Sequence, residues 1–361
     1  MKNKTIYIRL MKSLLLIFIL FLPLLSCWDV PVSMASGDNI TVIFNSLGGS
    51  IVPARTAASG SLLSNPQTPS RINYDFSGWY KDTSLTSPWD FSTDRVYDDI
   101  ILYAKWTYNG IPETFDVADR PSFIQNVAGD YYLCEPWNYN KAINSGREYP
   151  LFVYLHGAGS SGVPGVLPCF YNNDTQMKSY PCFIYLPHTA GSWNNATLIT
   201  QIENIKASYR IDTNRIYLMG YSMGGSGSYS LANAYYDHNQ HLFAGIVRMA
   251  GQSQTTVRNA IADKTSIWYH VGADDTEVRV QVAADSYDFL KNYPGNSSAI
   301  ETSSAVPLSS YPGTTLTLTK NGIEIIKYTV YDSPVAHGVS HFPLTDPYLL
   351  QWLFMQSLDK R

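Results

Sequence analysis

The sequence predicts an α/β protein with a mostly parallel sheet, preceded by a small β-rich module. Between residues 150 and 331, short and continuously apolar runs alternate with segments of helical spacing. This is the pattern of buried parallel strands with helices on both faces of the sheet. Residues 38–108 instead hold short alternating runs that are rich in Trp and Tyr and bounded by Gly, Ser and Asn. That pattern favours a separate β-rich unit.

Composition places the chain among ordinary globular proteins. It has 361 residues, which is typical of about two domains, with 45% hydrophobic and 15% charged residues. The formal net charge of −4 gives no electrostatic reason to expect a nucleic-acid partner. The spacing of the 4 Cys and 7 His residues suggests no metal site. We therefore expect neither a metal nor a cofactor.

The N-terminus predicts export. Basic residues are scattered over the first 12 positions, and residues 13–25 form an apolar run too short to cross a membrane comfortably. The run ends at Leu24-Leu25-Ser26-Cys27, which resembles the bacterial lipobox. The resemblance implies that residues 1–27 are a lipoprotein signal peptide. It also implies that Cys27 carries a lipid anchor in the cell envelope, on a face that the sequence leaves open. The alternative is an ordinary cleaved signal with an incidental cysteine.

Three cysteines remain for an exported chain, namely Cys134, Cys169 and Cys182. One bridge is possible in a compartment where disulfides persist, and Cys169 and Cys182 flank a single loop. The pairing stays open, because sequence alone does not fix connectivity.

Residues 38–108 carry a set of aromatic and glycine motifs in a fixed order. These are Phe44-Asn45, Gly48-Gly49, Gly78-Trp79-Tyr80, Trp89-Asp90-Phe91 and Leu102-Tyr103-Ala104-Lys105-Trp106. The segment resembles the Listeria-Bacteroides repeat, a small β-rich module of bacterial surface proteins. The resemblance implies a stalk, adhesion or spacer role, and the segment contains no nucleophile or acid–base set.

The rest of the chain is organised around a G-x-S-x-G motif at residues 220–224. An apolar run at residues 216–219 predicts a buried strand that leads into the motif, and residues 228–235 predict a helix after it. A serine on so sharp a turn needs glycines two positions before and after it, where strand and helix pass closely. Ser222 is therefore the candidate nucleophile.

Two further chemical groups follow strand ends in the predicted domain at residues 115–361. Asp275 comes after the apolar run at 266–272, and His337 after the run at 325–331. In a parallel sheet, the groups that follow the carboxyl ends of the strands meet at one edge. A serine, an acid and a histidine in this chain order form the α/β-hydrolase arrangement.

Residues 130–358 resemble α/β-hydrolase esterases of the predicted-peptidase and polyhydroxybutyrate-depolymerase-like group, close to feruloyl and acetylxylan esterases. The matching stretches are residues 149–157, 209–225, 272–278, His337, Asp346-Pro347 and Trp352-Leu353. The resemblance implies that Ser222 is the nucleophile, Asp275 the acid and His337 the base. Arg279 replaces a common proline and Ser340 a usual tryptophan. The second departure leaves His341 open as an alternative base.

Two backbone N–H groups are expected to bind the oxyanion. They belong to Met223, the residue after the nucleophile, and Ala158 in the glycine-rich loop after the strand at 150–155. We expect His156 to brace that loop rather than to take part in catalysis. His188, Trp193 and Gln252 follow other strand ends, and they are candidates for lining the substrate pocket.

The resulting hypothesis is an exported serine carboxylesterase that works through an acyl-enzyme. Feruloyl or acetyl esters on polysaccharide are the expected substrates, on the resemblance alone. A serine peptidase with the same triad is the first alternative, because the same groups can attack amides. An adhesin or glycan-binding protein with an inert hydrolase domain is the second.

Overall fold

The computed structural model describes residues 39–47, 49–50, 52–71, 74–108, 114–159, 167, 173–237, 241–306 and 312–360. Within it, Asp38–Arg361 form one compact unit. The expected signal peptide with Cys27 lies outside the described residues, and so does Cys169 with its expected pairing. Cys134 and Cys182 are both buried.

The segment at residues 39–108 forms a four-stranded sheet with the order β2-β1-β4-β3. Its strands are β1 (Asn39–Asn45), β2 (Val52–Ala58), β3 (Tyr74–Tyr80) and β4 (Ile100–Tyr108). β1 pairs with β4 in parallel, and the other two pairs are antiparallel. Its core combines aliphatic and aromatic side chains, and Trp79 packs edge-to-face on Phe44 and Phe76, with ring centroids 5.0 and 5.4 Å away. Large rings supply the buried area that about 70 residues otherwise lack.

The second sheet has ten strands in the order β12-β13-β14-β11-β10-β9-β7-β8-β6-β5. Its strands are β5 (Ile124–Gln125), β6 (Tyr131–Cys134), β7 (Tyr149–Leu155), β8 (Phe183–Pro187), β9 (Ile211–Tyr221), β10 (Gly245–Met249), β11 (Ser266–Gly272), β12 (Ile300–Ala305), β13 (Gly313–Lys320) and β14 (Ile323–Tyr331). Six consecutive strands of this sheet pair in parallel, namely β14, β11, β10, β9, β7 and β8. Antiparallel strands are added at both edges.

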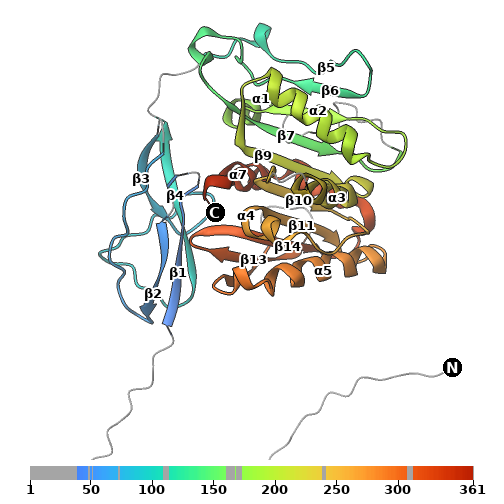
Figure 1. Cartoon of the computed structure of the whole chain (residues 1–361). Coiled ribbons are helices and arrows are strands. Elements are labelled where there is room, and N and C mark those ends of the chain that lie inside the picture. Colours follow the sequence, from blue (N-terminus) through green and yellow to red (C-terminus); the bar gives the residue numbers. More distant parts are fainter. Residues whose placement is uncertain are drawn as a thin grey trace, which may run out of the picture. The chain divides into compact units, whose positions relative to one another are not determined.

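Helices cover both faces of this sheet (Figure 1). The α-helices are α1 (Asp174–Ser179), α2 (Asn195–Ser208), α3 (Met223–Asp237), α4 (Asn259–Lys264), α5 (Glu277–Lys291), α6 (His341–Thr345) and α7 (Pro347–Met355). The 3₁₀ helices are η1 (Val117–Asp119), η2 (Ala142–Asn144), η4 (Pro294–Asn296), η5 (Ala336–Ser340) and η6 (Leu358–Lys360).

Two buried clusters show how the layers form. Side chains of α2, α3, α4 and α5 pack in one cluster, and those of α1 and α7 in the other. Successive strand residues alternate between them: Leu218 of β9 joins the first cluster and Met219 joins the second. The predicted α/β class, with a mostly parallel sheet, helices on both faces and a small β-rich module, is confirmed.

The structure extends several predicted elements. β9 begins at Ile211, five residues before the predicted run, and α3 begins at Met223, directly after the candidate nucleophile. An Asn-Gly turn joins β13 and β14 in a hairpin, with positive φ angles at Asn321 and Gly322.

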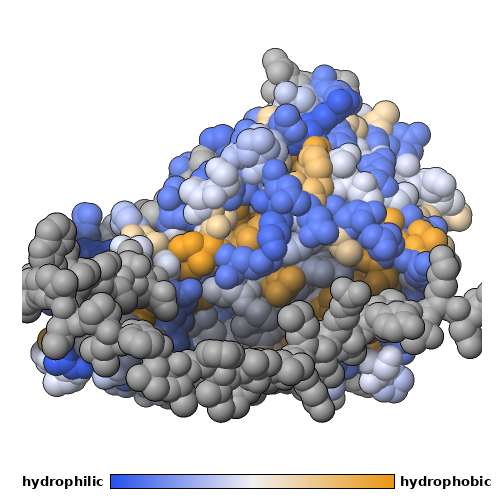
Figure 2. Space-filling model, turned by 90° about the horizontal axis from the view of Figure 1, so that it is seen from below, coloured by the Kyte–Doolittle hydropathy of each residue, from blue (hydrophilic) through white to orange (hydrophobic). Residues whose placement is uncertain are grey.

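On the face in Figure 2, the described residues that can be seen show hydrophobic side chains in several separate patches among hydrophilic ones. Surface hydrophobics scattered in this way are normal for folded proteins. In the part of the chain that the structure describes, no helix combines the length and the apolar character that a membrane crossing requires.

Candidate active site

Ser222 lies on a tight turn between β9 and α3, at the carboxyl edge of the ten-stranded sheet. Its φ of 55° is in the left-handed region, where a non-glycine residue is strained. A Cβ on Gly220 would overlap the carbonyl oxygen of Gly224, and one on Gly224 would overlap that of Leu155. Glycine is therefore required at both positions, and the close packing holds the serine hydroxyl at the strand end.

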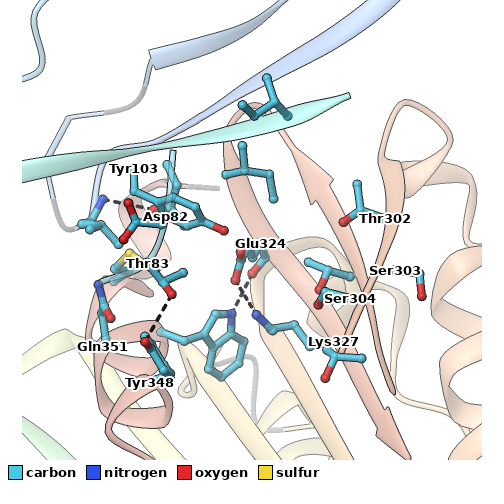
Figure 3. A pocket seen from close by; sticks show the side chains of 18 of the residues that line it. Asp82, Thr83, Tyr103, Thr302, Ser303, Ser304, Glu324, Lys327, Tyr348 and Gln351 are labelled. Atoms are coloured by element: carbon cyan, nitrogen blue, oxygen red, sulfur yellow. Dashed lines mark hydrogen bonds and ion pairs between the residues drawn. The ribbon is translucent and has the colours of Figure 1, made fainter. Parts of the chain in front are cut away.

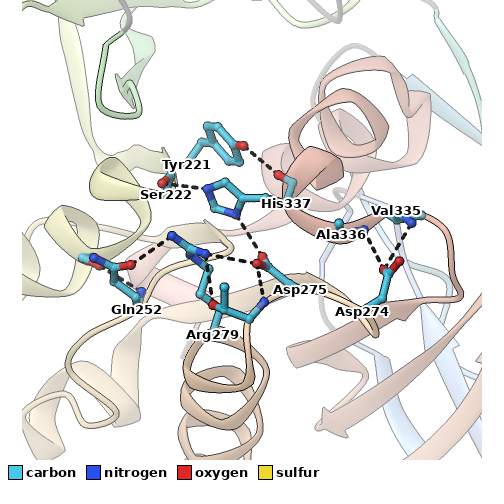
Figure 4. A network of polar contacts seen from close by, with 11 residues as sticks. Tyr221, Ser222, Gln252, Asp274, Asp275, Arg279, Val335, Ala336 and His337 are labelled. Carbon is cyan, nitrogen blue, oxygen red and sulfur yellow. Dashed lines mark hydrogen bonds and ion pairs between the residues drawn. The ribbon is translucent and has the colours of Figure 1, made fainter.

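His337 lies in η5, which follows β14, and it contacts both other members of the predicted triad (Figure 4). Its Nε2 is 2.9 Å from Ser222 Oγ, and its Nδ1 is 2.9 Å from Asp275 Oδ2. An ionised carboxylate only accepts hydrogen bonds, so Nδ1 carries the proton and Nε2 is left to accept the serine proton. Both contacts are made by His337 rather than by the alternative base, His341.

Asp275 follows β11 and is almost completely buried, with 1% of its side chain exposed, against 35% for His337. Its Oδ1 accepts hydrogen bonds from the backbone N–H of Thr276 at 2.7 Å and from Arg279 Nη1 at 3.1 Å. Its Oδ2 accepts from His337. With both oxygens occupied, the carboxylate is fixed in the orientation that holds the imidazole.

Two neighbouring residues hold the segment that carries the histidine, and sequence reasoning gave neither of them a role. Asp274 Oδ1 accepts from the backbone N–H groups of Ala336 at 2.6 Å and Val335 at 3.2 Å. Both hydrogen bonds lower the pKa of the Asp274 carboxyl, and the bond from Ala336 has the larger effect. The Asp274 side chain does not bond the imidazole of His337, but it anchors the backbone just before that residue.

Tyr221 is the second of these residues. Its hydroxyl donates to the carbonyl oxygen of His337 at 2.6 Å, and its ring lies 5.1 Å from the imidazole. Burial, followed by the charge of Asp275, raises the pKa of Tyr221, so the hydroxyl stays protonated and can donate. The position before the nucleophile gave no sequence signal for this contact, because the contact joins β9 to η5 across the fold.

The segments that carry the two expected oxyanion groups run beside the nucleophile. Met223 is the first residue of α3, and the first N–H groups of an α-helix have no partner within the helix. A Cβ on Gly157 would lie 3.4 Å from Ser222 Cβ, so the loop that carries Ala158 runs against the nucleophile. Ala158 itself is exposed.

His156 has the bracing contacts that the sequence predicted. It is buried, its Nδ1 lies 2.7 Å from the Gly157 carbonyl oxygen, and its Nε2 accepts from the Thr189 N–H. Burial lowers its pKa. A neutral imidazole with the proton on Nδ1 satisfies both bonds, and it ties the Ala158 loop to the loop after β8.

The three candidates for the substrate pocket have different surroundings. Trp193 is half-buried against the His156 ring, with centroids 4.7 Å apart, and its indole also lies close to Gly227 of α3. His188 is exposed, with its ring centroid 5.7 Å from that of His156. Gln252 is exposed, and its Oε1 accepts from Arg279 Nη2 at 3.0 Å. A role in substrate binding stays a prediction for all three.

A separate cavity of about 460 Å³ is lined by none of the triad residues (Figure 3). In its wall, Lys327 Nζ pairs with Glu324 Oε2 at 2.7 Å, and Trp352 Nε1 donates to the Glu324 carbonyl oxygen at 3.1 Å. These polar groups are therefore paired within the chain. Across the described ranges, no three His, Cys, Asp or Glu side chains are arranged to hold a metal ion.

Comparison with known proteins resolves the first part of the chain. Residues 41–105 match the family model of the Listeria-Bacteroides repeat domain. This segment is a Listeria-Bacteroides repeat domain. The chain is 37% identical over 82 residues to Internalin H of Listeria monocytogenes and 41% identical over 91 residues to a protein of Evansella cellulosilytica named "Putative membrane protein". These matches cover 22% and 25% of this chain, but only 15% and 14% of the relatives, so the chain spans a small part of the length of these relatives.

Solved structures resemble the chain beyond the repeat domain. A thermostable esterase shares 20% identity and a TM-score of 0.49, over 84% of this chain and 77% of that one. A ferulic acid esterase shares 16% identity and a TM-score of 0.44, over 65% and 96%. Similarity of this degree carries no argument about the reaction, which has to come from the site itself.

Proposed function

We propose that this protein is a serine hydrolase that cleaves carboxylic esters through an acyl-enzyme. The observation that carries the proposal is the continuous chain from Ser222 Oγ to His337 Nε2 and from His337 Nδ1 to Asp275 Oδ2, with 2.9 Å at each step. A buried carboxylate, an oriented imidazole and a strained serine are what activation of a hydroxyl requires.

The reaction proceeds in two halves. His337 takes the proton of Ser222 as Oγ attacks the ester carbonyl carbon, and the same proton then goes to the departing alkoxide, which leaves as an alcohol. Water repeats the sequence on the acyl-enzyme, which releases the carboxylic acid and restores the serine. Asp275 keeps the imidazole oriented and stabilises its charged form. The N–H groups of Met223 and Ala158 would bind the oxyanion, where losing one donor costs about 10²- to 10³-fold in rate.

Feruloyl or acetyl esters on polysaccharide are the substrates we propose, with the enzyme exported and held in the cell envelope through Cys27. The substrate class rests on the sequence resemblance to feruloyl and acetylxylan esterases. The location rests on the lipobox-like stretch at residues 24–27. The repeat domain would then act as a spacer.

The test compares the wild type with Ser222→Ala on p-nitrophenyl acetate, methyl ferulate and a short aminoacyl-anilide. We expect turnover of the two esters, little turnover of the anilide, and loss of all activity in the variant with an unchanged circular dichroism spectrum. Ser297→Ala is the matched control, because Ser297 is exposed and lies outside the site. Undiminished ester turnover in Ser222→Ala would refute the proposal, and preferred turnover of the anilide would favour a peptidase.

A further inference from the structure

Among the described residues, Asp275 forms side-chain ion pairs with His337 and with Arg279 (Figure 4). Arg279 Nη1 donates to Asp275 Oδ1 at 3.1 Å and to Thr276 Oγ1 at 3.0 Å. Its Nη2 donates to Gln252 Oε1 at 3.0 Å. Only 17% of the Arg279 side chain is exposed. The guanidinium is therefore a shielded clamp rather than a solvated surface charge.

The position of Arg279 is unfavourable for a cation when considered in isolation. It lies in the first turn of α5 (Glu277–Lys291), where the helix dipole presents its positive end. Its Nε is also buried without a hydrogen-bond partner. Buried donors without partners are destabilising, so the contacts of the two Nη atoms have to compensate. A cation in such an unfavourable local environment is expected mainly at a functional site.

The clamp connects three loops of the site. Gln252 follows β10, and its backbone N–H donates to Ser226 Oγ at 3.1 Å, on the helix that begins after the nucleophile. Arg279 thus joins the Gln252 loop to Asp275, and Asp275 joins it to His337. The planar guanidinium bonds Asp275 and Gln252 in two fixed directions, a geometry that a lysine ammonium at the same position cannot reproduce.

We propose that Arg279 is a positioning residue that, together with Gln252, fixes Asp275 against His337 and, as a permanent cation, extends the activity of the site to lower pH. This inference rests on the proposed serine hydrolase function. It goes beyond that function by giving a role to two residues outside the triad.

The direction of the expected shift in the pH–rate profile follows from the charges that face the His337 imidazole. Asp275 is the anion bonded to Nδ1, Tyr221 is a neutral hydroxyl on β9, and Arg279 on α5 lies behind Asp275. Asp274 bonds the backbone just before His337, and His341 follows at the start of α6. A nearby cation disfavours the imidazolium, the form that cannot accept the serine proton. Removing the cation should therefore move the acid limb of the pH–rate profile to higher pH.

The experiment measures kcat/KM against pH for Arg279→Met, Arg279→Lys and Gln252→Ala. For Arg279→Met we expect a loss of about 10- to 100-fold at the optimum and an acid limb about half a pH unit higher. For Arg279→Lys we expect kcat/KM to fall by about tenfold, because the ammonium cannot bond Asp275 and Gln252 in the two fixed directions of the guanidinium. The acid limb should not shift, because the positive charge remains. Gln252→Ala should behave like the lysine variant. The control is Arg258→Gln, which removes an exposed arginine paired with Asp237.

A second readout does not depend on turnover. The Nδ1 proton of His337 should give a low-field proton NMR signal, assigned by its loss in His337→Gln, and its titration midpoint should rise in Arg279→Met. If the wild type hydrolyses no ester and does not react with a fluorophosphonate at Ser222, the proposed function fails, yet this titration still decides the clamp. Titration and pH–rate curves in Arg279→Met that superimpose on those of the wild type would overturn the inference.

Discussion

The two sheets of this protein deal with buried polar groups in opposite ways. Within the described residues, the repeat domain buries one polar side chain, Asn45, beneath an otherwise apolar and aromatic core. The ten-stranded sheet and its helices bury His156, Arg248, His270 and Glu324 among others. Each buried polar group has to be compensated by hydrogen bonds. The small sheet is thus packed almost entirely from apolar side chains, whereas the large fold also accommodates buried polar groups.

Backbone strain is distributed in a similar way. In the repeat domain, the non-glycine residues with positive φ angles are Leu47 and Leu85, both in turns between strands. In the large sheet, Ser222 and Ala250 follow neighbouring strands, and Ala336 immediately precedes His337. A Cβ on Gly272, at the end of β11, would meet the backbone of Ala336. Three of the six such residues described outside the repeat domain therefore lie at the nucleophile, at the neighbouring strand end or beside His337, and the other three are Asn138, Gln254 and Asn321.

The largest expected effect comes from Asp275→Asn. An amide in place of the carboxylate can hold the imidazole in the wrong tautomer, with its proton on Nε2, so that it no longer accepts from Ser222. We expect kcat to fall by about 10³- to 10⁴-fold with little change in melting temperature. Steady-state kinetics on p-nitrophenyl acetate and a thermal melt measure both quantities. A loss below tenfold would contradict the assignment of Asp275.

Gly224→Ala should damage both activity and stability. The added methyl group would overlap the Leu155 carbonyl oxygen, so the backbone of the nucleophile turn has to move. We expect a loss of about 2–3 kcal/mol of unfolding free energy and about 10²-fold in kcat/KM. Urea unfolding and kinetics test this. The control is Gly191→Ala, where nothing lies within 4 Å of the added atom and stability should change by less than about 0.5 kcal/mol.

Trp79→Ala tests the division between the two sheets directly. Trp79 is 3% exposed in the core of the repeat domain, and its loss should destabilise that domain by about 3–5 kcal/mol. Turnover of a soluble ester should stay within about twofold of the wild type, because the triad belongs to the other sheet. Limited proteolysis and kinetics measure the two effects, with the exposed Tyr97→Ala as control. A loss of ester turnover that accompanies the loss of stability would contradict the independence of the two sheets.

The smallest expected effect is on acid stability. Burial, and then the charge of Lys327, lowers the pKa of His270 from 6.5 to about 3. Between these values the unfolded chain binds a proton that the folded chain does not, so stability falls as the pH falls through this window. His270→Phe removes this contribution and should shift the midpoint of acid unfolding downward by about half a pH unit. Circular dichroism from pH 7 to 3 measures it, and the exposed His241→Phe should leave the midpoint in place.

Local sequence patterns were sufficient to predict much of the fold. Unbroken apolar runs predicted buried parallel strands, and the strands that pair in parallel are β7, β8, β9, β10, β11 and β14. The triad candidates could be named because each follows its own strand, and parallel strands end at one edge. The short edge strand β5 lacked such a pattern, since only two residues pair and both are exposed.

The supporting contacts could not be predicted, because they depend on how separate elements meet. Arg279 was only a departure from a family pattern and Gln252 only a candidate for the pocket, but the structure joins them through a hydrogen bond of 3.0 Å. Asp274 is adjacent to Asp275 in sequence, yet its partners are the backbone groups of Val335 and Ala336. Side-chain direction across loops is set by tertiary packing, which no local pattern records.

The sequence by itself determined the α/β class, the repeat domain and the candidates Ser222, Asp275 and His337, because apolar periodicity and glycine-hinged turns act over a few residues. Only the tertiary structure decided that His337 rather than His341 meets the serine, and that Arg279, Asp274 and Tyr221 hold the acid and the base in place. The physical reason is distance along the chain: the bonds of Asp274, Ser222 and Tyr221 to the His337 segment join residues 62 to 116 positions apart, although Arg279 and Asp275 themselves are only four positions apart.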